Sequence, residues 1–187
     1  MKEHQGLNEK LIRFAKESSR MEIADDENVT QDIIASLKRD FKKITEIYQS
    51  ISKLEIIPGF REWLLDNYYM LVELHQRILH DVDEKWLAQF PRFQNGPYQG
   101  KVRLYVLLRE FFLFSDPPYS MNALSEYLNL YQQKKKLKNI EIWAIGSIGQ
   151  MVLFSMLKSI SCKAEEMIRF HENAQKVRKV SEKEPFS

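Results

Sequence analysis

The sequence predicts an all-α protein, a compact bundle of five to six helices with a proline- and glycine-containing connection near its middle. Hydrophobic residues make up 44% of the 187 residues, which is enough apolar material for a buried core. Only 6 Gly and 6 Pro are available for turns, and valine and threonine are scarce beside leucine, isoleucine, lysine and glutamate. Apolar residues also recur at spacings of three and four, the pattern of an amphipathic helix.

The first half of the chain divides at polar and turn-forming segments. Residues 1–27 contain a short expected helix around Leu11 and then an acidic linker. Thr30 is the expected N-cap of a long helix that ends before Pro58-Gly59. A second long helix is expected over residues 60–81, where the apolar positions again keep helical spacing.

The second half begins with a broken connection over residues 82–100, because its prolines and glycines forbid a long helix. Helices are then expected over residues 102–114, from a Ser120 cap to Tyr131, and from an Asn139 cap to about His171. The chain is thus expected to comprise an N-terminal helix and linker (1–27), a helical domain (28–172) and a charged tail or linker (173–187).

Charge and cysteine content narrow the function classes. The net charge is +2, so no global field indicates a nucleic-acid partner, and the basic cluster Lys134–Lys138 stands near an expected helix end, where it complements the helix dipole. A single cysteine, Cys162, excludes an internal disulfide and favours a reducing compartment, and we expect it to be a buried structural thiol. No secretory signal is expected from the polar start. The longest uncharged run, residues 142–157, falls short of a membrane span of about 20 residues.

No catalytic residue, metal ligand or cofactor site is recognisable. The sequence has neither a P-loop nor a dinucleotide-binding fingerprint. His75 and His80 are five residues apart and would point in different directions from one helix, so surface histidines are predicted. The acidic residues around Asp83 lack the spacing of a calcium loop and are expected to form a solvated helix end.

A polar network is predicted inside the bundle. Asp66 and Asn67 stand among bulky apolar residues in the helix over residues 60–81, although both are mediocre helix formers. A carboxylate that faces a core needs a cation or several donors. We therefore expect Asp66 to pair with Arg103 or Arg109, and Asn67 to bond across a helix–helix contact. The stability of the fold, not catalysis, is the favoured role of this network.

Three aromatic residues, Trp63, Tyr105 and Trp143, are predicted to anchor the core. Trp63 and Trp143 each lie on an apolar stripe within an expected helix, so both are expected to be largely buried. Trp86, in the broken connection, is expected to be more exposed.

Several motifs resemble the helical region near the N-terminus of cyclic β-1,2-glucan synthases. The first is Trp63-Leu64-Leu65-Asp66-Asn67, followed by an aromatic residue and Glu73. Phe90-Pro91-Arg92-Phe93 with the following glycines looks like that family's connection, and Val102-Arg103-Leu104-Tyr105 looks like its Pro-Arg-Val-Tyr stretch. Ile140-Glu141-Ile142-Trp143-Ala144 resembles its Gly-Glu-Leu-Trp-Ala. The resemblance covers roughly residues 57–170, and departs from the family at Tyr69, Gln150 and Ser155.

This resemblance implies a scaffold and no chemistry of the chain's own. Members of the family are large inner-membrane proteins that build β-1,2-glucan from UDP-glucose, with active sites in regions that this chain does not contain. The chain is then expected to be a non-catalytic helical scaffold domain, in the cytoplasm or at the cytoplasmic face of the inner membrane. Its expected partner is the glycosyltransferase domain of the same or a companion protein, with only indirect membrane contact, no nucleic acid and no cofactor. The alternative is a stand-alone helical protein-interaction or regulatory module.

Overall fold

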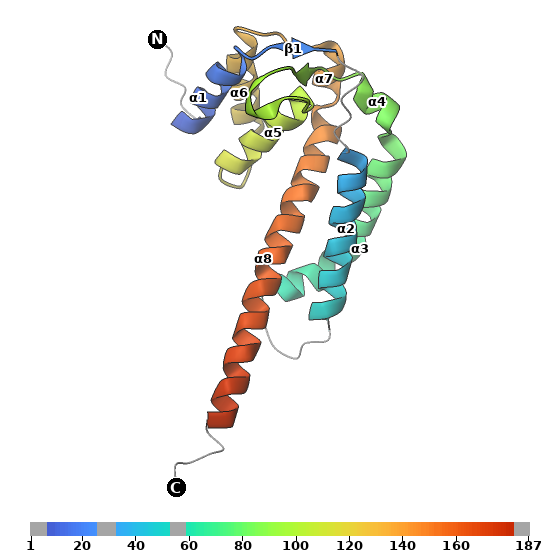
Figure 1. Ribbon diagram of the computed structural model, residues 1–187, viewed down its shortest axis with the longest axis vertical. Helices are drawn as coiled ribbons and strands as arrows, with labels where there is room; N and C mark the ends of the chain where they lie inside the picture. Colours follow the sequence, from blue (N-terminus) through green and yellow to red (C-terminus); the bar gives the residue numbers. More distant parts are fainter. Residues whose placement is uncertain (1–6, 26–32, 53–58, 182–187) are drawn as a thin grey trace. The chain divides into compact units, whose positions relative to one another are not determined.

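The computed structural model describes residues 7–25, 33–52 and 59–181. Within these ranges the chain forms eight α-helices, six of them seven residues or longer, together with one two-stranded sheet, and 76% of the structure is helical (Figure 1). The all-α prediction is therefore confirmed. The chain divides into two compact units: a first unit of residues 1–34 and 78–153, and a second unit of residues 35–77 and 154–187. The expected boundaries at residues 27 and 172 stay predictions.

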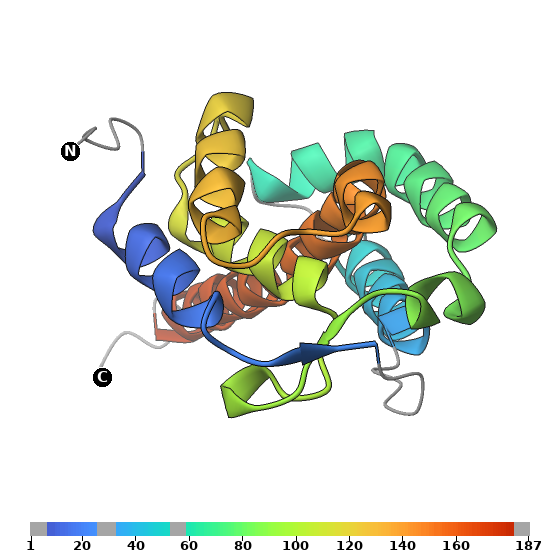
Figure 2. The ribbon, with the colours of Figure 1, turned by 90° about the horizontal axis from the view of Figure 1, so that it is seen from above.

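The first unit consists mainly of short helices, most of them from the middle part of the sequence. Its elements are α1 (Glu9–Ser18), β1 (Ile23–Ala24), α4 (Glu84–Ala88), β2 (Arg92–Phe93), the 3-10 helix η1 (Gly96–Tyr98), α5 (Arg103–Phe114), α6 (Met121–Gln132), α7 (Asn139–Trp143) and the start of α8 (Ile145–Ser181). α1 lies against α5 and α6 (Figure 2). α5 supplies much of the core, since Leu104, Leu107 and Leu108 are fully buried. The burial of these leucines stabilises the unit by roughly 1.5–3 kcal/mol each.

Local sequence signals set the helix starts of this unit. The side-chain oxygen of Asn8 accepts from the Leu11 amide at 3.0 Å, and the Ser120 hydroxyl accepts from the Ala123 amide at 3.3 Å, so the predicted Ser120 cap is confirmed. Such caps satisfy amides that have no partner within the helix. Asp83 caps α4 by accepting from the Trp86 amide at 2.7 Å, as expected for a helix end.

The proline- and glycine-containing connection contributes one strand of a small two-stranded sheet. β1 pairs antiparallel with β2, with Ile23 opposite Phe93 and Ala24 opposite Arg92. The described part of the expected acidic linker is therefore partly a strand, and its remainder lies outside the described residues. The Arg92 side chain is buried and donates to the Gly100 carbonyl at 3.1 Å, which ties the connection together. Gly100 has a φ of 76°, a backbone conformation that favours glycine.

The second unit contains most of α2 (Ile33–Ile51) and α3 (Phe60–Asp81) and the remainder of α8. Ile44, Ile47 and Ile51 are buried at helical spacing along α2. Aromatic rings stack between α2 and α3, with 3.9 Å between the ring centroids of Tyr48 and Tyr68. The two long helices expected here are confirmed, while Thr30 and Pro58 lie outside the described residues.

The last predicted helix is wrong in three respects. It divides at Ala144 into α7 and α8, and Lys138, rather than Asn139, occupies the N-cap position of α7. α8 continues to Ser181, well past the predicted end near residue 171. Lysine, arginine, glutamate and glutamine are good helix formers, so a charged segment without proline or glycine can continue a helix. Asn173, Ala174 and Arg178 are exposed in this part of α8.

One part of α8 is long and apolar enough to cross a membrane by length and composition alone. Within this stretch, Ile145–Phe170, an 18-residue window has a mean hydropathy of 1.3, and core helices of soluble proteins meet the same criterion. No other helix in the described part of the chain meets it. Only 33% of its apolar window is buried, so much of its apolar surface lies outside the core.

Candidate interaction surface

A fully buried ion pair lies beneath α7 in the first unit. Nε of Arg103 donates to Oε1 of Glu141 at 2.8 Å, and its terminal nitrogen Nη2 donates to the second carboxylate oxygen. The two side chains are only 3% and 0% exposed. Burial alone would lower the pKa of Arg103, but the hydrogen bond and the charge of Glu141 outweigh it, so the pKa is raised. A two-pronged, charge-assisted contact of this kind also fixes the relative orientation of the two side chains.

Glu141 has a second role at the start of α7. Its Oε2 accepts from the backbone amide of Lys138 at 2.8 Å, as an acidic residue in the first turn of a helix often does. The same carboxylate thus joins the start of α7 to the start of α5. Since successive helical residues are about 100° apart, anchoring Glu141 inward turns the next two residues outward. Ile142 is 46% exposed and Trp143 is 88% exposed.

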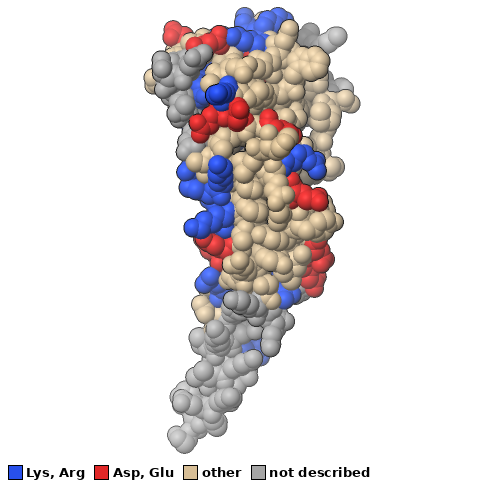
Figure 3. Space-filling model, turned by 90° about the vertical axis from the view of Figure 1, so that its right-hand side faces the viewer, with Lys and Arg blue, Asp and Glu red and all other residues tan. Residues whose placement is uncertain are grey.

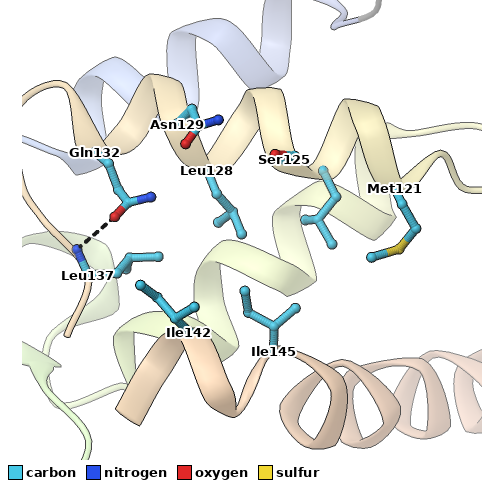
Figure 4. Close-up of a pocket in the computed structure, with 9 residues that line it drawn as sticks. Met121, Ser125, Leu128, Asn129, Gln132, Leu137, Ile142 and Ile145 are labelled. Carbon is cyan, nitrogen blue, oxygen red and sulfur yellow. Dashed lines mark hydrogen bonds between the residues drawn. The ribbon is translucent and has the colours of Figure 1, made fainter. Parts of the chain in front are cut away.

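An apolar groove runs between α6 and the segment that contains α7 (Figure 4). Its volume is ≈ 240 Å³. The groove is lined by Met121, Leu124, Ser125, Leu128, Asn129, Gln132, Leu137, Ile142 and Ile145. At one end, the side-chain oxygen of Gln132 accepts from the Leu137 amide at 3.4 Å. Met121, which is 71% exposed, lies at the opposite end of the row of α6 side chains in Figure 4.

The chemistry of this groove is that of binding and not of proton transfer. None of its lining residues is ionisable, and its few polar groups are amides and one hydroxyl. A concave apolar surface is typical of an interface that receives apolar side chains, and the exposed Trp143 directly follows the lining residue Ile142 in α7. Within the described residues, no group of three or more His, Cys, Asp or Glu side chains is placed to hold a metal ion. We call the groove together with Trp143 the α6–α7 surface.

The structure overturns the predicted polar network. Arg103 pairs with Glu141 and Arg109 with the neighbouring Glu110 at 2.7 Å, and Asp66 is exposed. Asn67 donates to the Trp63 carbonyl at 2.7 Å within its own helix, rather than across a helix contact. Asp66 and Asn67 fall on a helix face that meets water, where a carboxylate needs no partner.

Two of the three predicted core anchors are wrong as well. Trp63 is 44% exposed and Trp143 is 88% exposed, whereas Tyr105 is half-buried. Trp86, expected to be the most exposed tryptophan, is half-buried, and 4.6 Å separates its ring centroid from that of Phe90. Apolar spacing identified the helices but did not identify which apolar face meets the core.

Glu141 is the functional residue that sequence reasoning missed. An arginine in the apolar α5 does require a buried anion, but Glu141 stands 38 residues away in the sequence. A signal for it exists in the motif Ile140-Glu141-Ile142-Trp143-Ala144, where the glutamate stands in the first turn of a helix.

His75, expected on the surface, is buried in the second unit. Its ring stacks on Phe41 with 4.0 Å between centroids, and Phe154 lies 5.9 Å away. Burial and, to a smaller extent, the charge of Lys38 lower the pKa of His75. Among the described residues no group forms a hydrogen bond with its Nε2. Cys162, expected to be buried, is half-buried.

The basic cluster Lys134–Lys138 is partly structural. Lys135 donates to the Met21 carbonyl and Lys138 pairs with Asp25, so both lysines tie their loop to the segment around β1. Burial and the charge of Arg103 lower the pKa of Lys135, against the opposing charge of Glu22. On the molecular face of Figure 3, side chains of both signs are interspersed with uncharged surface.

By these features the chain is a helical domain. Its first unit encloses a buried ion pair and carries an apolar groove. The chain is 25% identical over 131 residues to the cyclic β-(1,2)-glucan synthase NdvB of Rhizobium meliloti (strain 1021). That match covers 66% of this chain but only 4% of the synthase, so the similarity is distant and partial. No family model matches the chain, and no solved structure matches it.

Proposed function

We propose that this chain is a non-catalytic helical scaffold domain of a cyclic β-1,2-glucan synthase-like glycosyltransferase, and that the α6–α7 surface binds the glycosyltransferase domain. The observation that carries the proposal is the motif around Glu141. Within the motif that resembles the synthases, one residue is buried in an ion pair and its neighbours Ile142 and Trp143 are exposed. The distant similarity to a glucan synthase supports the choice of partner.

The physical form of the surface suits an obligate or long-lived contact. Exposed tryptophan and isoleucine gain free energy when a partner removes them from water, and a groove of ≈ 240 Å³ accommodates a few apolar side chains. The ion pair beneath α7 fixes the position of that helix before binding, which reduces the ordering entropy lost on association.

The test is a binding measurement between the full chain and the glycosyltransferase region of a cyclic glucan synthase encoded in the same genome. We expect saturable binding that Trp143→Ala weakens about tenfold or more, as a central aromatic contact would. Tyr69→Ala is the matched control, because Tyr69 is 63% exposed and lies on α3 of the second unit, outside the residues that line the groove. Absence of binding by the unaltered chain, or equal losses in both variants, would contradict the proposal.

A stand-alone interaction or regulatory module is the second possibility, and the same surface would serve it. Capture of an unrelated protein through Trp143, with no affinity for the transferase region, would favour it. Sequencing the gene beyond the codon for Ser187 separates the two independently. A reading frame that runs on into glycosyltransferase sequence supports the scaffold, and a stop codon there favours the module.

A further inference from the structure

A second apolar surface, unrelated to the α6–α7 surface, lies along α8 in the second unit. Ile160 is 54% exposed and Met167 is 64% exposed, which is unusual for large side chains seven residues apart on one helix. We define the α8 stripe as Met156, Ile160, Lys163, Met167, Phe170 and Ala174. Their spacings alternate between four and three residues, the heptad pattern of a helix that packs along a second helix.

The face of α8 that meets its own unit is a different one. Ser161, Glu165 and Ile168 are buried there. Glu165 accepts from Lys43 of α2 at 3.2 Å and from Arg169 at 2.8 Å. At about 100° per residue, the α8 stripe is centred roughly 150° around the helix from this buried face. The stripe therefore does not belong to the core of the second unit.

The ionic contacts of α8 argue against a lipid environment for this stripe. Asp40 lies 3.9 Å from Lys158, and Glu165 contacts both Lys43 and Arg169. Burial would raise the pKa of Glu165, but its hydrogen bonds with Arg169 and Lys43 hold that pKa below its usual value. A spanning helix would have to carry these charges into hydrocarbon at a cost of about 2.5–3.5 kcal/mol for each charged side chain near the bilayer centre. The length and hydropathy of α8 are thus explained better by an apolar partner in water.

We infer that the α8 stripe is a self-association surface, on which a second copy of this chain packs its own α8 antiparallel to the first. The stripe is self-complementary in one register. With the two-fold axis near residue 165, Ile160 meets Phe170 of the second copy and Met156 meets Ala174. Each contact is repeated by symmetry, as an isologous interface requires.

Charge decides between the two possible orientations. In the antiparallel arrangement Lys163 of each copy lies near Glu166 of the other, so two cations and two anions gather at the axis. A parallel pairing would instead place Lys163 directly opposite Lys163, with like charges facing in an otherwise apolar seam. A single polar residue in such a seam commonly sets register and orientation at some cost in affinity. The dimer is accordingly expected to be reversible.

The test is sedimentation equilibrium of the full chain between about 5 and about 500 µM, since mass action makes a reversible dimer concentration-dependent. We expect a monomer–dimer equilibrium. Ile160→Glu should abolish dimerisation, and Tyr69→Glu, an exposed site on α3, should not change it. Both sites are exposed, so at a concentration where the unaltered chain is monomeric both variants should keep its unfolding midpoint. A chain that stays monomeric at every concentration would overturn the inference. The same holds if the monomeric chain binds lipid vesicles through its α8 stripe.

Charge exchange tests the antiparallel register itself. Lys163→Glu and Glu166→Lys should each weaken dimerisation about tenfold, and the double variant should restore it, because opposite charges again meet across the axis. A spin label at residue 174, in a Cys162→Ser, Ala174→Cys background, reports orientation. An antiparallel pair separates the two labels by about 27 Å along the helix axis, whereas a parallel pair holds them about 10 Å apart. The antiparallel arrangement would be overturned if the losses of dimer affinity in the two single variants simply added in the double variant. A distance of about 10 Å between the two spin labels would overturn it as well.

Discussion

The two units of this protein handle buried polar groups in opposite ways. In the first unit a full ion pair, Arg103 with Glu141, is enclosed in the core and both charges are satisfied. In the second unit His75 is buried between aromatic rings, and the buried carboxylates of Asp40 and Glu165 pair with cationic side chains that stay partly exposed. The first unit thus encloses both partners of its ion pair, whereas the second leaves the cationic partners in contact with water.

The largest expected effect follows from removing half of the enclosed pair. Glu141→Gln should lower the free energy of unfolding by about 3–5 kcal/mol, because Arg103 is left as an uncompensated buried cation. The measurement is urea unfolding followed by circular dichroism. Asp66→Asn is the control for loss of a carboxylate, since Asp66 is exposed and should change the free energy by no more than about 0.5 kcal/mol. If both substitutions lowered the free energy of unfolding equally, the enclosed ion pair would not distinguish the first unit from the second.

The second unit should respond to pH in a window where the first does not. Because the folded-state pKa of His75 lies below its ordinary value of 6.5, the unfolded chain binds the proton more readily. Stability from this residue is therefore present above about pH 6.5 and is lost as the pH falls below it. Unfolding followed by urea at pH 7.5 and pH 5.5 measures the loss. His75→Phe keeps a ring on Phe41 and should abolish this part of the pH dependence; an unchanged dependence would assign it to another group.

A smaller effect is expected at the partly exposed ion pairs. Glu165→Gln should cost about 1 kcal/mol or less, because Lys43 and Arg169 retain access to water. The loss should shrink as salt is raised, since screening already weakens exposed pairs in the unaltered chain. Unfolding free energies in low and high salt test this. A loss as large as that of Glu141→Gln would place Glu165 in the same class as the enclosed pair.

The smallest effect on stability is expected at the exposed aromatic residue. Trp143→Ala should change the free energy of unfolding by about 0.5 kcal/mol or less, because Trp143 is 88% exposed. In a chain that carries Phe at positions 63 and 86, its emission should match that of tryptophan in water and be fully quenched by iodide. A blue-shifted, protected emission would show that Trp143 packs against the protein and is not presented for binding.

Sequence reasoning predicted the long helices and the start at Ser120, because those depend on nearby residues, but it placed the last helix start at Asn139, where Lys138 is the N-cap. The cap at Ser120 and the breaks at the proline- and glycine-containing connection need only local chemistry. The end of α8 could not be predicted in this way, because a charged segment can either continue a helix or form an irregular tail.

The candidate site was less accessible to prediction, because it depends on which helix faces meet. Arg103 was expected to pair with Asp66, but its partner is Glu141, which is brought close only by the tertiary fold. Trp143 is apolar and lies in a helix, which predicts burial, yet the inward anchoring of Glu141 turns it to the solvent. An exposed tryptophan cannot be told from a core tryptophan by spacing alone.

The measurement that tests the central claim most directly is a double-mutant cycle on the enclosed pair, with Arg103→Met, Glu141→Met and the double variant. If the pair anchors α7 as the structure indicates, each single substitution should be strongly destabilising. The double variant should then be more stable than the sum of the two losses by about 2–3 kcal/mol, since neither charge remains unpaired. Losses that simply add would mean that the two residues do not interact, and the account of how the α6–α7 surface is held would be contradicted.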